Sequence, residues 1–224
     1  MARPPRFDVQ QLLDAAVRLA AAGGPAAVTM SAVAMEVGAP SGSVYHRFAG
    51  RPALLAEVWL RTVESFQDGY FKALKAGVDA RQAGCAAARH VVAWSRAHPQ
   101  EAALLLYGAE DFGRADWPEE HLQRADRGNQ RVRASLASLA TALGAEGQQD
   151  TERVALAVVD LPLSLVRRHL RTGDPLPAHA EDLAEECTAA LLASLPTASA
   201  AVPTAPATGR RTVRVAIERD SRGA

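Results

Sequence analysis

The segment from residue 29 to residue 55 constrains the fold of this chain more than any other. Apolar residues recur in it at helical spacing in two short runs, and the sequence Gly-Ala-Pro at residues 38–40 separates them. Because glycine and proline end helices, we expect one helix over residues 29–37, with Thr29 as a candidate N-cap, and a second over residues 41–48. Two short helices joined by a tight turn that contains glycine form a helix-turn-helix unit.

Helical periodicity continues through most of the chain. One helix fits residues 8–23 before the motif, and the others follow it: a long helix up to Gly77, then residues 79–97, 99–108, 118–143, 150–171 and 179–195. Pro162 lies inside one of these segments, and we expect a kink or break there because an interior proline costs about 3 kcal/mol. The pattern predicts an all-α fold of about nine helices, with a three-helix helix-turn-helix domain first and a helical domain behind it.

Composition divides the chain into three parts. Residues 1–50 hold the helix-turn-helix domain, and residues 51–195 hold the second helical domain. From residue 196 onward Pro, Ala and Thr dominate, and the last fifteen residues contain five arginines. We expect residues 196–224 to form a disordered, basic tail.

Composition also sets the class of protein. Lys+Arg and Asp+Glu are both 25, so net charge argues neither for nor against nucleic acid. Cys85 and Cys187 are too few for a disulfide framework, and we interpret both as buried thiols in a reducing compartment. There is no pattern of a signal peptide and no apolar run of about 20 residues. We expect a soluble, cytoplasmic protein that makes no membrane contact.

Catalytic motifs are missing from the sequence. No histidine has a glutamate three residues before it, as di-iron bundles require, and no H-E-x-x-H, nucleophile-elbow or phosphate-loop motif occurs. Asp111, His121 and His169 are isolated titratable residues. We therefore expect no enzyme, no metal and no cofactor, and an all-helical enzyme remains only the weakest alternative.

The second short helix of the motif carries the functional signal. Val44 and Phe48 are assigned to the core, which leaves a very short polar surface. Small hydroxyls at the start of a helix let it approach the DNA major groove closely, and a phenol or a guanidinium can bind phosphate. The polar residues of this helix are Ser41, Ser43, Tyr45, His46 and Arg47.

This stretch resembles the DNA-binding domain of the TetR family of bacterial regulators, which carries a pattern close to G-V-S-x-G-T-L-Y-x-H-F-x-x-K-x-x-L-L. Residues 38–48 read GAPSGSVYHRF, and the preceding helix, VTMSAVAMEVG, also matches. The resemblance covers roughly residues 8–60. Pro40 replaces the usual serine cap, so the cap either passes to Ser41 or is absent, and Arg47 replaces the usual histidine or tyrosine.

The resemblance implies a role for each DNA-binding position. The residues nearest the bases would be Ser31, Ser41, Gly42, Ser43 and His46, and those that hold the DNA backbone would be Thr29, Tyr45, Arg47 and Arg51. Few long side chains are available to read bases, so specificity would depend partly on DNA shape and on paired half-sites. The implied partner is a palindromic double-stranded operator bound by a homodimer.

The resemblance also implies a small-molecule effector and a dimer interface in the second domain. A repressor released by its ligand is the expected function, and a repressor without an effector is the alternative; a cavity between the middle helices would favour the first. The candidate ligand-binding residues are Phe66, Tyr70, His90, Trp94, Tyr107, Asp111, Phe112 and Trp117, although an aromatic residue at helical spacing is more often plain core. The candidate dimer contacts are Leu156, Val159, Leu163, Val166, Leu183, Cys187 and Leu191.

Overall fold

The computed structural model describes residues 8–195, and within that range every regular element is helical. The α-helices are α1 (Val9–Gly23), α2 (Met30–Glu36), α3 (Ser41–Tyr45), α4 (Arg51–Ala76), α5 (Ala80–Ala97), α6 (Pro99–Leu104), α7 (Glu119–Ala142), α8 (Gly147–Ala155), α9 (Leu161–Thr172) and α10 (Ala180–Ala193). A π-helical turn over Leu156–Asp160 joins α8 to α9 without a gap, so the described residues form nine helical rods. The prediction of an all-α fold with about nine helices is confirmed.

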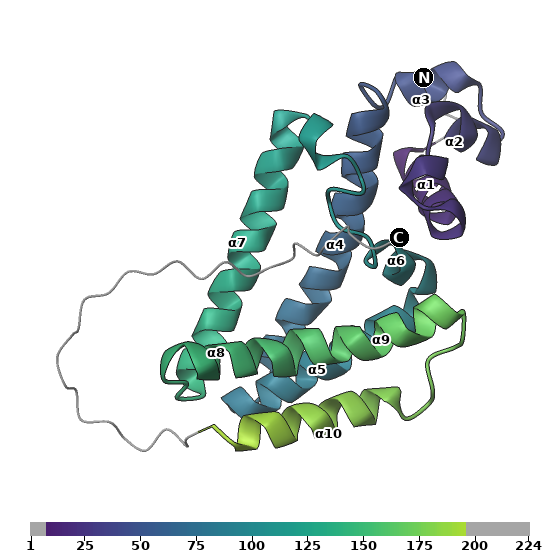
Figure 1. Cartoon of the computed structure of the whole chain (residues 1–224). Helices are drawn as coiled ribbons and strands as arrows, with labels where there is room; N and C mark the ends of the chain where they lie inside the picture. Colours follow the sequence, from purple (N-terminus) through teal and green to yellow (C-terminus); the bar gives the residue numbers. More distant parts are fainter. Residues whose placement is uncertain (1–7, 196–224) are drawn as a thin grey trace, which may run out of the picture.

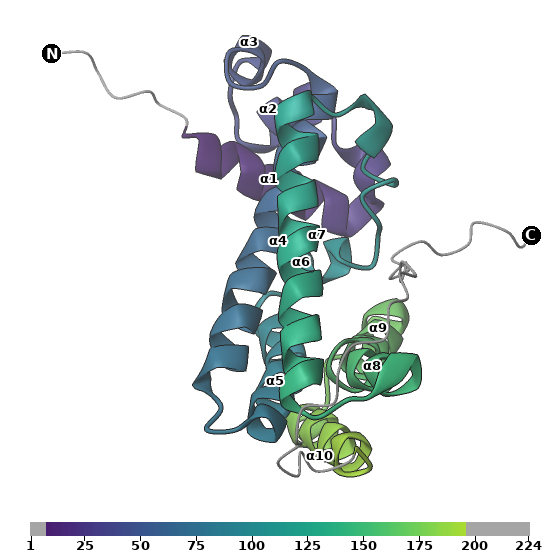
Figure 2. The same ribbon diagram turned by 90° about the vertical axis from the view of Figure 1, so that its left-hand side faces the viewer.

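The helices build an elongated molecule (Figures 1 and 2). Helices α1, α2 and α3 gather around the first turns of α4 at one end, and α8, α9 and α10 lie at the opposite end. Helices α4 and α7 run side by side between the two ends, and α5 packs against α4, α9 and α10. The two short helices of the motif therefore stand at the far tip of the molecule.

One hydrophobic core fastens the tip to the rest of the molecule. It contains the buried faces of α1 to α3 and of the start of α4, and it crosses residue 50 without a break. Phe112 and Trp117, from the segment between α6 and α7, are buried in this same core, and the Trp117 indole N–H donates to the Phe112 carbonyl at 2.9 Å. The segment before α7 is thus part of the core beneath the helix-turn-helix.

Two helices end earlier than the sequence predicts. Helix α3 ends at Tyr45 instead of near Phe48, and α6 ends at Leu104 instead of Gly108. In each case the chain tightens to bonds between residues three apart, from the Arg47 amide to Val44 and from the Tyr107 amide to Leu104. The hydrophobic pattern continues through such a turn, which is why periodicity extends both helices too far.

Pro162 occupies the second position of α9, directly after the π-helical turn. In that turn the Leu161 amide donates to the Leu156 carbonyl, five residues earlier. The expected kink or break therefore takes the form of a wider helical turn, which continues the rod.

Other expectations concern the cysteines and the chain ends. Cys85 and Cys187 are free thiols, but both are half-buried rather than buried. The Cys85 sulfur lies 3.9 Å from the Glu185 carbonyl oxygen, where α5 contacts α10. Among residues 8–195 there is no helix long and apolar enough to cross a membrane and no metal-binding cluster of His, Cys, Asp and Glu. The predicted tail over residues 196–224 lies outside the described residues.

Candidate DNA interface and effector region

The turn between α2 and α3 is fixed by backbone hydrogen bonds. Gly38 follows the end of α2 with φ +66°, in the left-handed region. Its amide donates to the Met35 carbonyl at 3.1 Å, and the Ala39 amide donates to the Ala34 carbonyl at 2.8 Å. These two bonds are a Schellman motif, which satisfies the last carbonyls of α2 and reverses the chain sharply. At the other end of α2, the Thr29 hydroxyl accepts from the Ala32 amide at 3.1 Å, which confirms the predicted N-cap.

Helix α3 is stabilised by the packing of its apolar side, without a side-chain cap at its start. Val44 is fully buried and Phe48 is 7% exposed, as predicted for core residues. Pro40 occupies the N-cap position, where no side chain accepts a hydrogen bond, so of the two outcomes weighed from the sequence the cap is absent. The five-residue helix therefore depends on packing against α2 rather than on its own termini.

Most of the candidate DNA-binding residues lie on the surface of the tip. Tyr45 is 60% exposed, and Ser43 is the one half-buried member of the set. Small, exposed groups at the start of α3 leave room for a close approach of the DNA backbone, and the phenol and cations stand at its end. The exposed members are Thr29, Ser31, Ser41, Gly42, Tyr45, His46, Arg47 and Arg51.

The Arg51 guanidinium has hydrogen-bond partners inside the protein. Its Nε donates to the Val28 carbonyl at 2.8 Å and its Nη2 donates to the Pro25 carbonyl at 2.9 Å. These bonds tie the start of α4 to the segment before α2. Two of the five N–H donors are used, so a phosphate contact can still be made from the remaining ones.

Four candidate effector residues form one aromatic cluster between α4 and α5. The Phe66 ring lies 5.9 Å from Tyr70, 5.6 Å from His90 and 5.3 Å from Trp94, measured between ring centroids. The His90 Nε2 lies 3.1 Å from the Phe66 carbonyl oxygen. This close approach requires Gly69, where an added Cβ would lie 2.2 Å from the imidazole.

Burial shifts two titratable groups in this cluster. It raises the pKa of the Tyr70 phenol, so the hydroxyl is protonated and can donate. Burial also lowers the pKa of His90, and the nearby His98 lowers it further. The hydrogen bond to the Phe66 carbonyl acts in the opposite direction and raises this pKa, but by less. The rings of this cluster pack against one another and occupy the space between α4 and α5.

The other four candidates lie in the segment before α7, away from this cluster. Phe112 and Trp117 are buried in the core beneath the helix-turn-helix, and Trp117 packs 5.6 Å from Trp59. Tyr107 is 39% exposed, and the exposed Asp111 carboxylate accepts from the Gly108 amide at 2.7 Å. The structure therefore distributes the eight candidates between two separate places.

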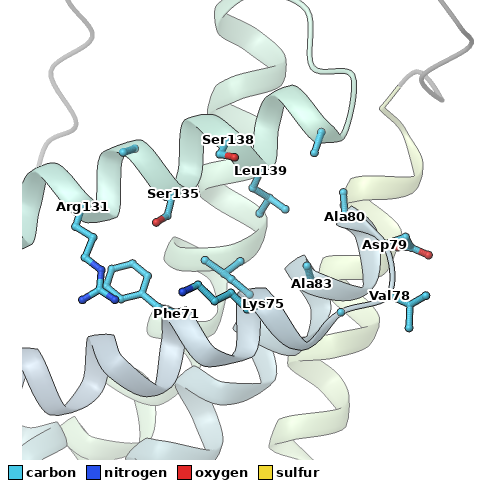
Figure 3. Close-up of a pocket in the computed structure, with 14 residues that line it drawn as sticks. Phe71, Lys75, Val78, Asp79, Ala80, Ala83, Arg131, Ser135, Ser138 and Leu139 are labelled. Atoms are coloured by element: carbon cyan, nitrogen blue, oxygen red, sulfur yellow. The ribbon is translucent and has the colours of Figure 1, made fainter.

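A cavity of about 600 Å³, widely open to solvent, lies elsewhere, between the end of α4, the start of α5 and the second half of α7 (Figure 3). Its volume lies in the range of small-molecule sites. Phe71 and Leu74 of α4, Ala83 of α5 and Leu139 of α7 supply apolar walls. None of the eight residues chosen from the sequence lines it. The polar side chains at this cavity are Lys75, Asp79, Arg131, Ser135 and Ser138, which no sequence signal singles out because the packing of α4 against α7 brings them together.

The candidate dimer contacts lie at the end opposite the motif, and their exposure differs. Leu156 and Leu183 are large apolar residues that are 46% and 39% exposed. Val166 is 3% exposed and packs in the core of its own chain. The half-buried members are Val159, Leu163, Cys187 and Leu191.

Comparison with known proteins matches this geometry to a family. Residues 12–58 match the model of the family described as bacterial regulatory proteins, tetR family. This range includes α1 from Leu12 onward, the whole of α2 and α3, and the first turns of α4. No curated protein matches the sequence.

Solved structures share the fold over most of the chain. The transcriptional regulator FadR from Bacillus subtilis, in complex with stearoyl-CoA, has a TM-score of 0.65 and 14% identity, with 84% of this chain and 100% of that chain covered. The ketosteroid transcriptional regulator KstR2 of Mycobacterium tuberculosis has a TM-score of 0.65 and 16% identity, covering 85% and 97%. The TetR family regulator PfmR from Thermus thermophilus has a TM-score of 0.60 and 21% identity, covering 86% and 99%. At these identities the likeness is one of fold.

Proposed function

Because residues 12–58 are a DNA-binding domain of the TetR family of bacterial regulatory proteins, we propose that this transcriptional regulator is a repressor that binds a palindromic operator as a homodimer and leaves it when a small molecule binds. The observation that carries the proposal is the placement of α3 at the tip of the molecule, with Ser41 and Tyr45 exposed on it and Arg47 and Arg51 exposed just after it. On this proposal the protein acts in the cytoplasm and is not an enzyme.

The DNA part of the proposal follows from the surface of α3. The serines and Gly42 would lie nearest the bases, and Tyr45, Arg47 and Arg51 would bind phosphates on either side. Serine makes no bidentate contact of the kind that arginine makes to guanine. Sequence preference would then come largely from DNA shape and from the spacing of two half-sites.

Dimerisation is proposed through α8, α9 and α10. A five-residue recognition helix offers little affinity alone, and two half-sites about 34–36 Å apart would multiply it. The exposed Leu156 and Leu183 supply apolar surface at the end of the molecule that faces away from DNA. Such a dimer would leave both copies of α3 accessible on the opposite side.

The solvent-open cavity beside α7 offers an effector a place to bind. A fully packed second domain would have favoured the alternative, and the solved complex of the Bacillus subtilis relative with stearoyl-CoA supports a ligand for this fold. The ligand would bind better to a form whose two α3 helices are wrongly spaced for DNA, since a ligand with equal affinity for both forms would release nothing.

Genome-wide capture of DNA fragments by the purified protein, followed by footprinting of the best fragment, tests the proposal. A protected palindrome is the expected result, and the neighbouring genes would suggest ligands to try for release. No enrichment over bulk DNA, at low salt and without ligand, would refute operator binding by α3.

A further inference from the structure

We propose that the cavity between α4, α5 and α7 binds an anionic amphiphile, that is, a molecule in which a carboxylate or phosphate is joined to an apolar segment. This inference rests on the proposed function because it names the chemical class of the effector. It comes from the distribution of charge and apolar surface along the cavity (Figure 3).

Two cations stand on one side of the cavity. Figure 3 shows the Lys75 ammonium and the Arg131 guanidinium near each other, from facing helices. No hydrogen bond or ion pair is found for Lys75 among the described residues. The Arg131 guanidinium lies 4.0 Å from the Phe71 ring centroid, and this cation–π contact fixes its face while its edge stays available to an anion.

One hydroxyl, that of Ser135, lies on the cation side of the cavity, and a second, that of Ser138, lies further along α7 beside Leu139 (Figure 3). Ser135 and Ser138 both line the cavity from α7, and within residues 8–195 neither hydroxyl has a hydrogen-bond partner. A carboxylate or phosphate accepts several hydrogen bonds at once, so two cations and two hydroxyls suit it better than they suit a neutral group.

The other side of the cavity is apolar. Leu74, Ala83 and Leu139 line it, and the last two are 6% and 7% exposed in the surrounding core. Val78 also borders the cavity, but it is 92% exposed and its side chain points away from the other labelled residues (Figure 3). An alkyl or similar segment that extended from the cations along Leu74 and Leu139 would cover the apolar wall.

Two carboxylates lie near the site and keep their negative charge, but neither pairs with Lys75. Asp79 lines the cavity, but its Oδ1 accepts from the Gln82 amide at 2.8 Å as the N-cap of α5. Asp68 lies 3.7 Å from Arg131, beyond hydrogen-bond length, and both side chains are more than half exposed. A bound anion would displace this weak ion pair.

Calorimetric titration of the full-length chain with decanoate, decyl phosphate and 1-decanol tests the charge preference. We expect both anions to bind about tenfold more tightly than the alcohol. Lys75→Gln and Arg131→Gln should each weaken anion binding about tenfold and leave the alcohol unchanged, and Asp68→Asn should strengthen anion binding. The matched controls Lys72→Gln and Arg133→Gln remove exposed cations of the same helices that do not line the cavity. Equal binding of anion and alcohol, an equal loss in the controls, or no binding of either anion would overturn the inference.

A second pair of variants tests the place of binding. Ser138→Trp puts a large ring at the cavity, and Ala137→Trp puts the same ring on a neighbouring exposed position of α7 outside it. We expect the first to abolish decanoate binding and the second to leave it unchanged. If both variants bind alike, the anion sits elsewhere and the inference fails.

Release of the footprinted operator by the same probes separates this inference from the proposed function. Anion binding at the cavity without release would support the ligand class and contradict ligand-driven derepression. Release by a cationic or neutral compound, with no anion binding, would support ligand-driven derepression and contradict the anionic ligand class.

Discussion

The Tyr70 hydroxyl of α4 donates a hydrogen bond of 3.3 Å to the Val158 carbonyl, which lies in the π-helical turn four residues before Pro162. Pro162 has no N–H, so it cannot supply the bond that a helical residue would give this carbonyl. The Thr188 hydroxyl of α10 donates to the neighbouring Ala157 carbonyl at 2.9 Å. Two buried side chains from other helices, Tyr70 and Thr188, thus donate hydrogen bonds to carbonyls near the proline, where the backbone lacks one amide donor.

Replacing Tyr70 by phenylalanine should therefore lower stability. The buried Val158 carbonyl would lose a donor, and we expect the free energy of unfolding to fall by about 1–2 kcal/mol in urea titration. Tyr107→Phe is the control, because no hydrogen bond is found for that hydroxyl among the described residues, and it should change stability by less than about 0.5 kcal/mol. An equal loss in both variants would show that the Tyr70 bond contributes nothing.

Two glycines of the motif should respond oppositely to alanine. Gly38 has φ +66° and no atom within 4 Å of an added Cβ, so Gly38→Ala meets backbone strain alone and should cost about 1–2 kcal/mol of stability. Gly42 lies in α3 with open space around it, so Gly42→Ala should leave stability unchanged or slightly raised.

The added methyl group of Gly42→Ala would instead contact DNA, and we expect at least about a tenfold loss of operator affinity in a filter-binding or anisotropy assay. Unchanged operator binding by Gly42→Ala would exclude the start of α3 from the interface.

Local sequence patterns are sufficient for the helices but not for the turns that long-range contacts stabilise. Apolar spacing and the Gly38 break predict α2 and α3, because both signals act within a few residues. The π-helical turn depends on Tyr70 and Thr188, which lie 88 and 31 residues from their acceptors. No window of local sequence contains such a pair, so Pro162 alone predicts only a kink.

The salt dependence of DNA binding separates two roles of Arg51. Arg51→Ala would leave the Val28 carbonyl without a donor and the Pro25 carbonyl with the Val28 amide alone, so we expect a stability loss of about 1–2 kcal/mol. It should also weaken binding to all DNA sequences and lower the salt slope by about one unit. Arg51→Lys keeps the charge but lacks the planar guanidinium that places Nε and Nη2 on the two carbonyls, and should lose stability while the slope is kept. A slope that Arg51→Ala leaves unchanged would make Arg51 a purely structural residue.

The same limit applies to the candidate effector site. Aromatic composition favours Phe66 and Trp94 because pockets use such side chains, yet the two rings pack edge to face, 5.3 Å apart. The cavity lies between the end of α4 and the second half of α7, and its cations belong to helix faces whose sequence is that of ordinary solvated surface. Only the packing of these two helices brings Lys75 and Arg131 to one opening.

His90 should make the stability of the protein depend on pH. Burial lowers its pKa in the folded chain below the ordinary value of about 6.5, so the unfolded chain binds more protons between those two values. The neutral imidazole contributes to stability fully above about pH 6.5, and this contribution is lost as the pH falls toward the folded pKa. The free energy of unfolding changes by less than about 1.4 kcal/mol per pH unit, which is the limit for one proton. His90→Gln removes the titrating group, so its free energy of unfolding should fall less steeply than that of the parent chain as the pH is lowered. Both free energies come from urea titrations at a series of pH values. If His90→Gln and the parent chain lose stability in parallel, the imidazole is solvated as well when folded as when unfolded, and the close packing of α4 against α5 at Gly69 is looser in solution than the structure shows.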